Sequence, residues 1–405
     1  MYYFEEALIE AARNNQEKMN KLLEKSIEND EVFGYYLFYG ADFDVDNYQE
    51  LLDKNDSLAI AVKMCLILDN KHRKESRELA EQSGEPIAFY EQYKFLSTHG
   101  DDVRGNQYLK RLLDMKYPLA YYEFADKIAK TPYKFDTGYD NKKLLYFIKK
   151  AVEYKFLPGY LAYGQLYAGK CLIRKDINKA INIYRKLIED HKNSVYIGAM
   201  HEIIKVYEQY QKNNELFYAC LELSSNVNES YGIAYKHLSN FYQKDRFKHK
   251  DIIKALIYKK CLCIDDNDYR VFLDVSDIYL KKLKRKDISL NMAYEYMLKF
   301  FNINGPEDFG DQLMHHYYPI VKYLMDNKPK KKKYENYYEL GINYLNDNNQ
   351  EEAYKAFLNG FLVDQKKCFK ELANFYREGI VVEKDVAAAN ALMFASKNKF
   401  LFKKN

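Results

Sequence analysis

A fixed spacing of thirteen residues between a tyrosine and an alanine recurs three times in this 405-residue chain. In each copy a small residue lies three positions before the tyrosine, and an aspartate lies nine positions after it. Self-similarity of this kind is typical of arrays of helical hairpins, in which one unit is too small to bury its own apolar face. The three tyrosine–alanine pairs are Tyr167–Ala180, Tyr242–Ala255 and Tyr376–Ala389.

Each position of this repeat has a physical role in a pair of antiparallel helices. The small residue (Gly164 in the first copy) allows close approach of a neighbouring helix, and the tyrosine fills the adjacent groove. The aspartate is expected to cap the second helix by accepting hydrogen bonds from amides that the first turn leaves unpaired. Proline, which suits the first turn of a helix, marks further predicted helix starts at Pro86, Pro118 and Pro158.

Composition agrees with a mostly helical chain. Only 16 Gly and 7 Pro are present, too few for the tight turns of an all-β fold or the Gly-rich loops of a nucleotide-binding α/β enzyme. The chain has 41 Tyr and 24 Phe but no Trp, so a packed core can form and a disordered chain is excluded. Much of this tyrosine is therefore predicted to pack between repeated hairpins.

These motifs resemble the Sel1-like branch of the tetratricopeptide repeat superfamily, whose units pair a helix bearing L-G-x-x-Y with a helix that opens D-x-x-K-A. The resemblance implies an all-α, right-handed superhelical solenoid of stacked antiparallel helix pairs that binds other proteins. Several units lack the family's glycines, so the number of repeats stays open. The expected organisation is degenerate N-terminal repeats (1–80), Sel1-like repeats (81–326), a lysine-rich linker (327–333) and C-terminal hairpins (334–405).

Charge and cysteine usage favour a soluble, cytoplasmic chain. The formal net charge is only +4, and neither an apolar stretch of membrane-spanning length nor a secretory leader is recognisable. The six cysteines have no zinc-site or disulfide spacing and are expected to be reduced, buried thiols. They are Cys65, Cys171, Cys220, Cys261, Cys263 and Cys368.

No motif predicts catalysis, a cofactor or a metal. His201 begins a zincin-like H-E-x-x-x pattern, but Lys205 stands where a second imidazole would be needed. Adjacent His315 and His316 diverge on a helix. The segment 42–53 imitates a calcium loop without its glycine or its final glutamate, and Asp46 as a helix cap is the simpler interpretation.

The run from Asn327 to Lys333 places five lysines around Pro329. Like charges repel and proline stops a helix, so the run is interpreted as a solvated linker. A nuclear-localisation or nucleic-acid patch is the alternative.

The predicted function is a non-catalytic protein-interaction scaffold or adaptor, with an immunity or inhibitor protein as one form of it. The alternatives are RNA binding by helical repeats and an enzyme or regulator without a recognisable site. By analogy with tetratricopeptide repeats, the partner would lie on the concave face that the first helix of each hairpin forms. Its predicted contacts are Tyr121, Leu161, Gln165, Lys236, Asn240, Tyr338, Lys370, Asn374 and Arg377.

Overall fold

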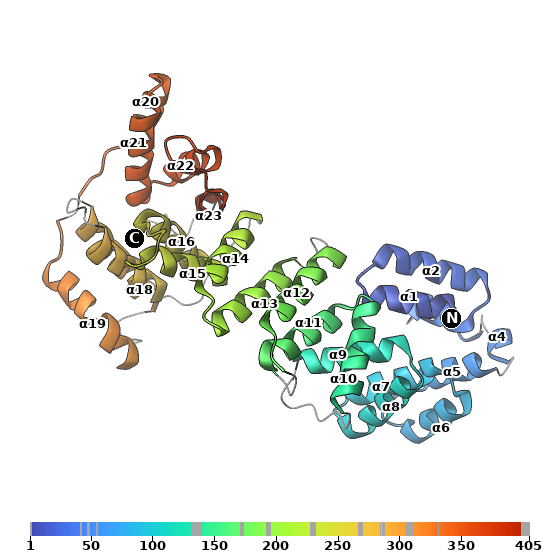
Figure 1. The fold of residues 1–405 in the computed structure, drawn as a ribbon. Coiled ribbons are helices and arrows are strands. Elements are labelled where there is room, and N and C mark those ends of the chain that lie inside the picture. The colour runs from blue at the N-terminus through green and yellow to red at the C-terminus, as the bar shows by residue number, and fades with distance from the viewer. Residues whose placement is uncertain are drawn as a thin grey trace. The chain divides into compact units, whose positions relative to one another are not determined.

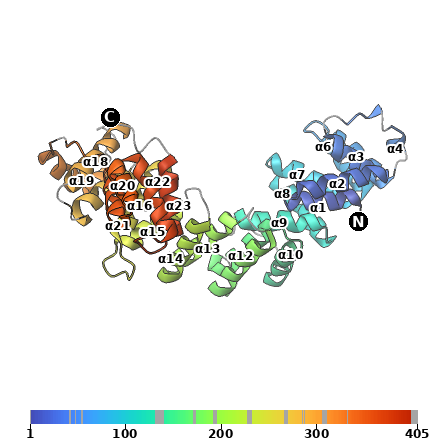
Figure 2. The same ribbon diagram turned by 90° about the horizontal axis from the view of Figure 1, so that it is seen from above.

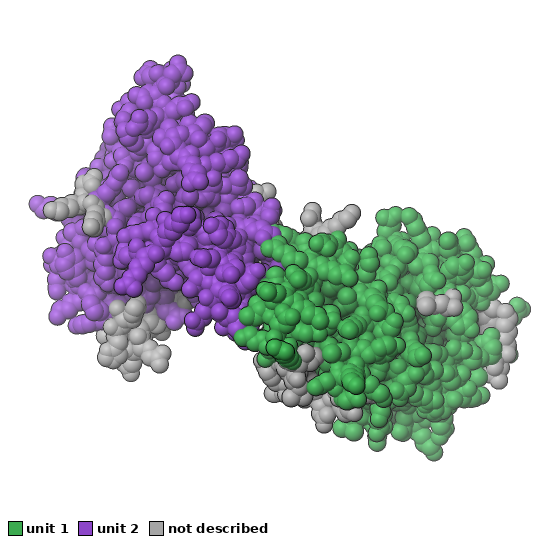
Figure 3. Space-filling view, viewed as in Figure 1, with its two compact units in different colours: residues 1–199 green, residues 200–405 purple. Residues whose placement is uncertain are grey.

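The fold was analysed in a computed structural model that describes residues 2–40, 43–46, 49–53, 56–130, 140–170, 174–191, 196–226, 232–265, 270–283, 285, 288–304, 311–330 and 332–397. Within these ranges the regular structure is entirely helical, without a β-strand. The chain divides into two compact units, residues 1–199 and 200–405, which are described separately below (Figure 3).

Unit 1 is a series of helical hairpins (Figure 1). Most consecutive helices pack against each other, and α9 also packs on α11, so neighbouring hairpins share an apolar interior. The helices of unit 1 are α1 (Tyr3–Ala12), α2 (Gln16–Glu28), α3 (Val32–Tyr39), α4 (Gln49–Asp53), α5 (Ser57–Leu66), α6 (Arg73–Ser83), α7 (Pro86–Thr98), α8 (Asp102–Asp114), α9 (Pro118–Lys130), α10 (Asn141–Glu153), α11 (Leu157–Gln165), the π-helical turn η3 (Leu166–Lys170) and α12 (Ile177–His191).

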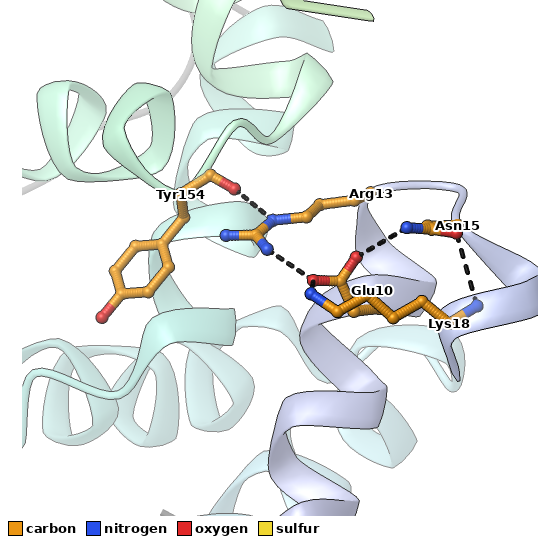
Figure 4. A network of polar contacts seen from close by, with 5 residues as sticks. All are labelled: Glu10, Arg13, Asn15, Lys18 and Tyr154. Carbon is orange, nitrogen blue, oxygen red and sulfur yellow. Dashed lines mark hydrogen bonds and ion pairs between the residues drawn. The ribbon is translucent and has the colours of Figure 1, made fainter. Parts of the chain in front are cut away.

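The N-terminal hairpin of unit 1 is held to a distant part of the same unit. Helix α1 packs against α9, and the Arg13 Nε donates a hydrogen bond to the Tyr154 carbonyl, 2.6 Å away, in the turn after α10. The buried Glu10 carboxylate accepts from Arg13, Lys18 and Asn15 at 2.6, 2.8 and 3.1 Å (Figure 4). We call these five residues the Glu10 cluster.

Unit 2 continues the hairpins, and α13 (Tyr196–Gln209) begins before the boundary between the units. The π-helical turn η5 extends α17 in the way that η3 extends α11. The other helices of unit 2 are α14 (Asn213–Asn226), α15 (Gly232–Gln243), α16 (Ile252–Asp265), α17 (Arg270–Asp277), η5 (Ile278–Lys282), α18 (Ser289–Asn304), α19 (Asp311–Asp326), α20 (Tyr337–Asn346), α21 (Gln350–Leu362), α22 (Lys366–Glu378) and α23 (Val386–Lys397).

The C-terminal hairpins of unit 2 fold back onto earlier hairpins. Helix α23 packs against both α14 and α16, and Figures 1 and 2 show α22 and α23 beside them. Its alanines are buried in this contact, and the Asn390 amide donates to the carbonyls of Ser224 and Ser225, each at 3.1 Å. Helices α14 and α16 are thus covered by the C-terminal module, by which we mean helices α20–α23.

A buried lysine joins the same two parts of unit 2. The Lys260 ammonium on α16 is fully buried and donates to the Asp364 carboxylate at 2.7 Å and to the Phe361 carbonyl at 2.8 Å. Lys299 and the Tyr296 hydroxyl also donate to Asp364, each at 3.1 Å. We call Lys260, Tyr296, Lys299 and Asp364 the Lys260 cluster.

The structure confirms the repeated hairpin at the level of individual hydrogen bonds. In all three copies the aspartate N–H donates to the carbonyl of the tyrosine nine residues earlier, at 2.8–3.0 Å. Each aspartate side chain caps the following helix, accepting from Lys179, from Ile253 and Lys254, or from Ala388. The alanine four residues after each aspartate is completely buried. The prediction of an all-α solenoid is therefore confirmed.

Close approach at the small residue is also confirmed. A Cβ at Gly164 would overlap the ring of Tyr184 on the partner helix α12. Ser239 at the equivalent position donates from its hydroxyl to the Ala255 carbonyl of its partner helix, at 3.1 Å. The small side chain therefore sets the distance between the two helices of one hairpin.

The structure also confirms predictions about the prolines, the repeated tyrosine and the cysteines. Helices α7 and α9 begin at their prolines, and Pro158 lies in the first turn of α11. The repeated tyrosine is buried in the hairpins of unit 2 and half-buried at Tyr167 in unit 1. Five of the six cysteines are free and buried, as expected, and Cys171 lies outside the described residues.

The division into units does not follow the motif boundaries of the sequence. Contacts separate the chain near residue 199, whereas motif quality changes near 80, 326 and 333. The repeat motif measures how well one hairpin matches another, while compactness depends on which hairpins touch. The motif boundaries therefore stay a prediction.

Candidate groove in unit 2

An open groove in unit 2 is a candidate site among the described residues. It has a volume of about 430 Å³ and is lined by the end of α13, the start of α14 and the outer face of α15. Its lining mixes amides, charges and apolar side chains. The residues are Glu208, Gln211, Asn213, Leu216, His237, Asn240, Phe241, Gln243 and Lys244.

The polar wall of the groove comes from one face of α15. Lys236 and Asn240 are exposed and four residues apart, so they lie on the same side of α15, and the exposed Lys244 follows directly after the helix ends at Gln243. An amide can donate to and accept from a peptide backbone, and an ammonium group can pair with a carboxylate. This row can therefore bind both the backbone and an acidic side chain of an extended segment.

A histidine and a glutamate face each other in the same groove. The His237 Nε2 lies 3.6 Å from a Glu208 carboxylate oxygen, and its side chain is largely buried whereas that of Glu208 is half exposed. Burial lowers the pKa of His237, and Lys236 and Lys244 lower it further, while Glu208 opposes the shift. The imidazole is therefore neutral near pH 7 and available as a hydrogen-bonding group.

An aromatic cluster forms the apolar floor. Phe241 and Leu216 are buried beneath the polar wall, and the Lys244 ammonium lies 4.9 Å from the centre of the Phe241 ring. Phe217 on α14 contacts Phe241 and Phe247 at 5.8 and 4.9 Å between ring centres. The groove thus has a rigid base, because these rings are packed from both sides.

The structure places the other predicted contacts of unit 1 mostly in the interior. Tyr121 is 2 % exposed and stacks on Tyr154, and Gln165 is also buried. Leu161 packs with a core cluster around Tyr160. Tyr121 and Gln165 therefore offer no accessible surface, which corrects their expected position on an open face. Tyr121 is covered by Phe147 of α10 and by Tyr154 in the turn after it.

The C-terminal predicted contacts lie on a different helix pair from the groove. Lys370 and Asn374 are exposed on α22, and the Asn374 amide donates to Glu371 at 3.4 Å. Arg377 donates to Asn390 of α23 at 3.4 Å, so it is partly occupied within the fold. Tyr338 is half-buried, with the Lys367 ammonium 5.0 Å above its ring. Of the predicted set, only Asn240 lines the groove, with Lys236 next to it.

Metal and cofactor sites gain no support from the part of the chain that the structure describes. No group of three or more His, Cys, Asp or Glu side chains there could hold a metal ion. His201 is on α13 without a second imidazole, and the side chains of His315 and His316 lie outside the described residues. The suggested calcium loop is also incomplete, since residues 42 and 47 fall outside them. Asp46 as a cap of α4 stays a prediction for the same reason.

Most of the groove was missed because its hairpin, α13–α14, matches the repeat weakly. Glu208, Gln211 and Asn213 come from this hairpin. Lys244 could have been found, because it extends the four-residue spacing of Lys236 and Asn240. His237 has no such signal, since a single histidine beside a predicted contact is compatible with a packing role.

Comparison with known proteins gives similarities in fold and no close relative. No protein-family model matches the chain, and no curated protein matches it. A protective antigen of uropathogenic Escherichia coli, described as displaying an SLR fold, is similar over 87 % of this chain and 79 % of its own, with 13 % identity and a TM-score of 0.45. A Sel1 repeat protein from Oxalobacter formigenes is similar over 82 % and 89 %, with 14 % identity and a TM-score of 0.40.

Membrane-spanning helices are absent from the described ranges, because none of their helices combines sufficient length with an apolar sequence.

What defines the chain is its own repeat, with the same hydrogen bond between aspartate and tyrosine and the same capping contact in three hairpins. The described part of the chain is thus an all-α array of repeated helical hairpins, whose motif resembles that of Sel1-like repeats.

Proposed function

We propose that the chain is a protein-interaction scaffold that binds an extended segment of a partner in the groove of unit 2. The observation that carries this proposal is the set of exposed polar side chains on α15 and directly after it, above a packed apolar floor. Polar groups at fixed spacing give register and specificity, while an apolar floor supplies the area that drives association. An immunity or inhibitor protein is one form of this function, in which the bound partner is an enzyme or toxin.

The test uses the full-length chain as bait for affinity capture from its native cells at physiological salt. The groove variant Asn240→Ala/Lys244→Glu is expected to lose at least about tenfold of a stoichiometric partner, because contacts at the centre of an interface carry most of its free energy. Helical circular dichroism should stay unchanged, since both side chains are exposed.

The matched control is Asn182→Ala/Lys186→Glu on α12 of unit 1, where the same residue types lie exposed with the same four-residue spacing. It should bind the partner as the unaltered chain does. Equal capture by the groove variant and the control would contradict the proposal. A captured species that is released by ribonuclease would favour the RNA-binding alternative instead.

A further inference from the structure

One short segment outside the groove carries a net positive charge. Residues 318–335 contain six lysines and two acidic residues, a net charge of +4, which equals the formal net charge of the whole chain. The remainder of the chain is therefore formally neutral. A segment of this kind can attract a polyanion although the molecule as a whole does not.

The same segment begins with an exposed apolar surface on α19. This helix packs on unit 2 through Ile320 and Leu324, which are buried, and the Tyr317 hydroxyl donates to Asp274 at 2.5 Å. Tyr318 and Met325, which are 46 and 50 % exposed, lie seven residues apart and share one face of α19, whereas Tyr323, 48 % exposed, lies on another side of the helix. Figure 1 shows α19 at the margin of unit 2, beside α18.

Lysines surround and follow these apolar side chains. Lys322 lies on α19, and Lys328, Lys330 and Lys333 come after it, all exposed and without an acidic partner among the described residues. Lys332 is exposed too, with its ammonium 5.8 Å from the centre of the Tyr334 ring. A linker needs charge to stay solvated, but it does not need two large apolar side chains, Tyr318 and Met325, exposed on the same helix face as Lys322.

We propose that α19 and the lysines after it form a docking surface for an anionic lipid bilayer. Tyrosine and methionine side chains partition into the interface of a bilayer, while clustered lysines are attracted to anionic headgroups. The strength of such peripheral binding rises with the apolar area buried and with the attraction to anionic lipids, and this surface offers both. Met325 has no aromatic face on which a base could stack, so its exposure favours lipid over nucleic acid.

This docking is independent of the groove on α13–α15, because the two surfaces share no residue. The scaffold would thereby hold its protein partner at a membrane surface. Loss of one activity should leave the other intact, so the two proposals can fail separately.

The experiment measures co-sedimentation of the full-length chain with vesicles of phosphatidylcholine alone or with roughly 30 % phosphatidylserine. Binding is expected only to the anionic vesicles and should weaken as salt rises from about 50 to about 500 mM. At roughly fivefold per lysine near the surface, neutralising four lysines should lower partitioning at least about a hundredfold. The lysine variant is Lys328→Gln/Lys330→Gln/Lys332→Gln/Lys333→Gln.

Two further variants separate specific docking from a general charge effect. Tyr318→Gln/Met325→Gln keeps the lysines and should weaken binding at high salt as well as at low salt, because it removes the apolar contribution of one face of α19. A matched variant that neutralises four exposed lysines of unit 1 lowers the net charge equally and should bind as the unaltered chain does. It is Lys71→Gln/Lys110→Gln/Lys149→Gln/Lys186→Gln.

Each opposite outcome overturns the proposal. Equal loss in the lysine variant and in the matched variant would show a general charge effect. Unchanged binding by the apolar variant would show that the apolar side chains of α19 do not contribute to docking, which contradicts the proposal. Absence of binding to anionic vesicles, together with lysine-dependent binding of single-stranded RNA in a filter assay, would assign the surface to nucleic acid.

Discussion

The two units hold their terminal hairpins by polar clusters of opposite construction. In unit 1 a buried carboxylate, Glu10, is surrounded by cations that reach water, since the side chains of Arg13 and Lys18 are 27 and 56 % exposed. In unit 2 a cation, Lys260, has no exposure at all, and its partner Asp364 has only 10 %. Water can replace a lost partner in the Glu10 cluster but not in the Lys260 cluster.

The aromatic surroundings increase this difference. The Lys260 ammonium lies 4.3 Å from the centre of the Phe361 ring and 5.4 Å from that of Tyr279, so ring faces and two acceptors replace its hydration shell. Removing one partner of a buried ion pair leaves an uncompensated charge, which costs more than the pair contributes. The C-terminal module should therefore depend on its cluster far more than the N-terminal hairpin depends on its own.

The largest expected effect is that of Asp364→Asn. Asp364 has a φ of 55°, which asparagine tolerates, so the variant removes charge without backbone strain. With Lys260 left buried and unpaired, unit 2 should lose about 3–5 kcal/mol of stability. Hydrogen exchange of peptides from α16 and α21–α23 measures this loss separately from unit 1.

Asp30→Asn is the matched control, because Asp30 occupies an equivalent left-handed turn in unit 1, with a φ of 56°, and is exposed. Its exchange should stay close to that of the unaltered chain. Similar small effects for both variants would contradict the assigned role of the Lys260 cluster.

The second-largest effect is expected at acid pH, which should weaken the contact between the C-terminal module and α16. Burial by itself would raise the pKa of Asp364, but Lys260 and Lys299 hold it below its usual range. A lowered folded pKa means that stability is present above the unfolded value near 4 and is lost as pH falls through the folded value. Faster exchange in α21–α23 below about pH 4 is expected.

The Asp364→Asn variant supplies the control for this titration. Its exchange, already fast, should no longer accelerate through that carboxyl as the pH is lowered. A variant that keeps the full acid dependence of the unaltered chain would locate the titrating group elsewhere.

The smallest of these effects is expected for Glu10→Gln in unit 1. The amide keeps the shape of the side chain, and both the half-buried Arg13 and the exposed Lys18 reach water, so a loss of about 1–2 kcal/mol is expected. Hydrogen exchange in α1 and α2 provides the measurement. Glu17→Gln is its control, because Glu17 pairs with Lys21 while both are largely exposed. A loss as large as that of Asp364→Asn would refute the contrast between the clusters.

Local features of the fold were predictable from particular residues. Asp176, Asp251 and Asp385 were expected to cap helices, and they do, because a cap and its amides lie within three residues of one another. Gly164 and Ser239 marked close helix approach for a similar reason.

The groove was predicted only through Asn240 and the neighbouring Lys236. Tyr121 and Gln165 were expected on an open face but are buried, Tyr121 against Phe147 and Tyr154 of the neighbouring hairpin helix and its turn. An exposed face on one repeat is thus no proof of an exposed face on another.

By itself, the sequence determined the hairpin: its small residue, its tyrosine, its capping aspartate and its buried alanine, which all act within about one repeat length. Only the tertiary structure decided that α23 returns to α14 and α16 and that Lys260 meets Asp364, 104 residues away. The sequence does not distinguish a buried lysine from a solvated one, because burial depends on which hairpins stack on each other. That choice depends on contacts summed over distant helices, which no local spacing records.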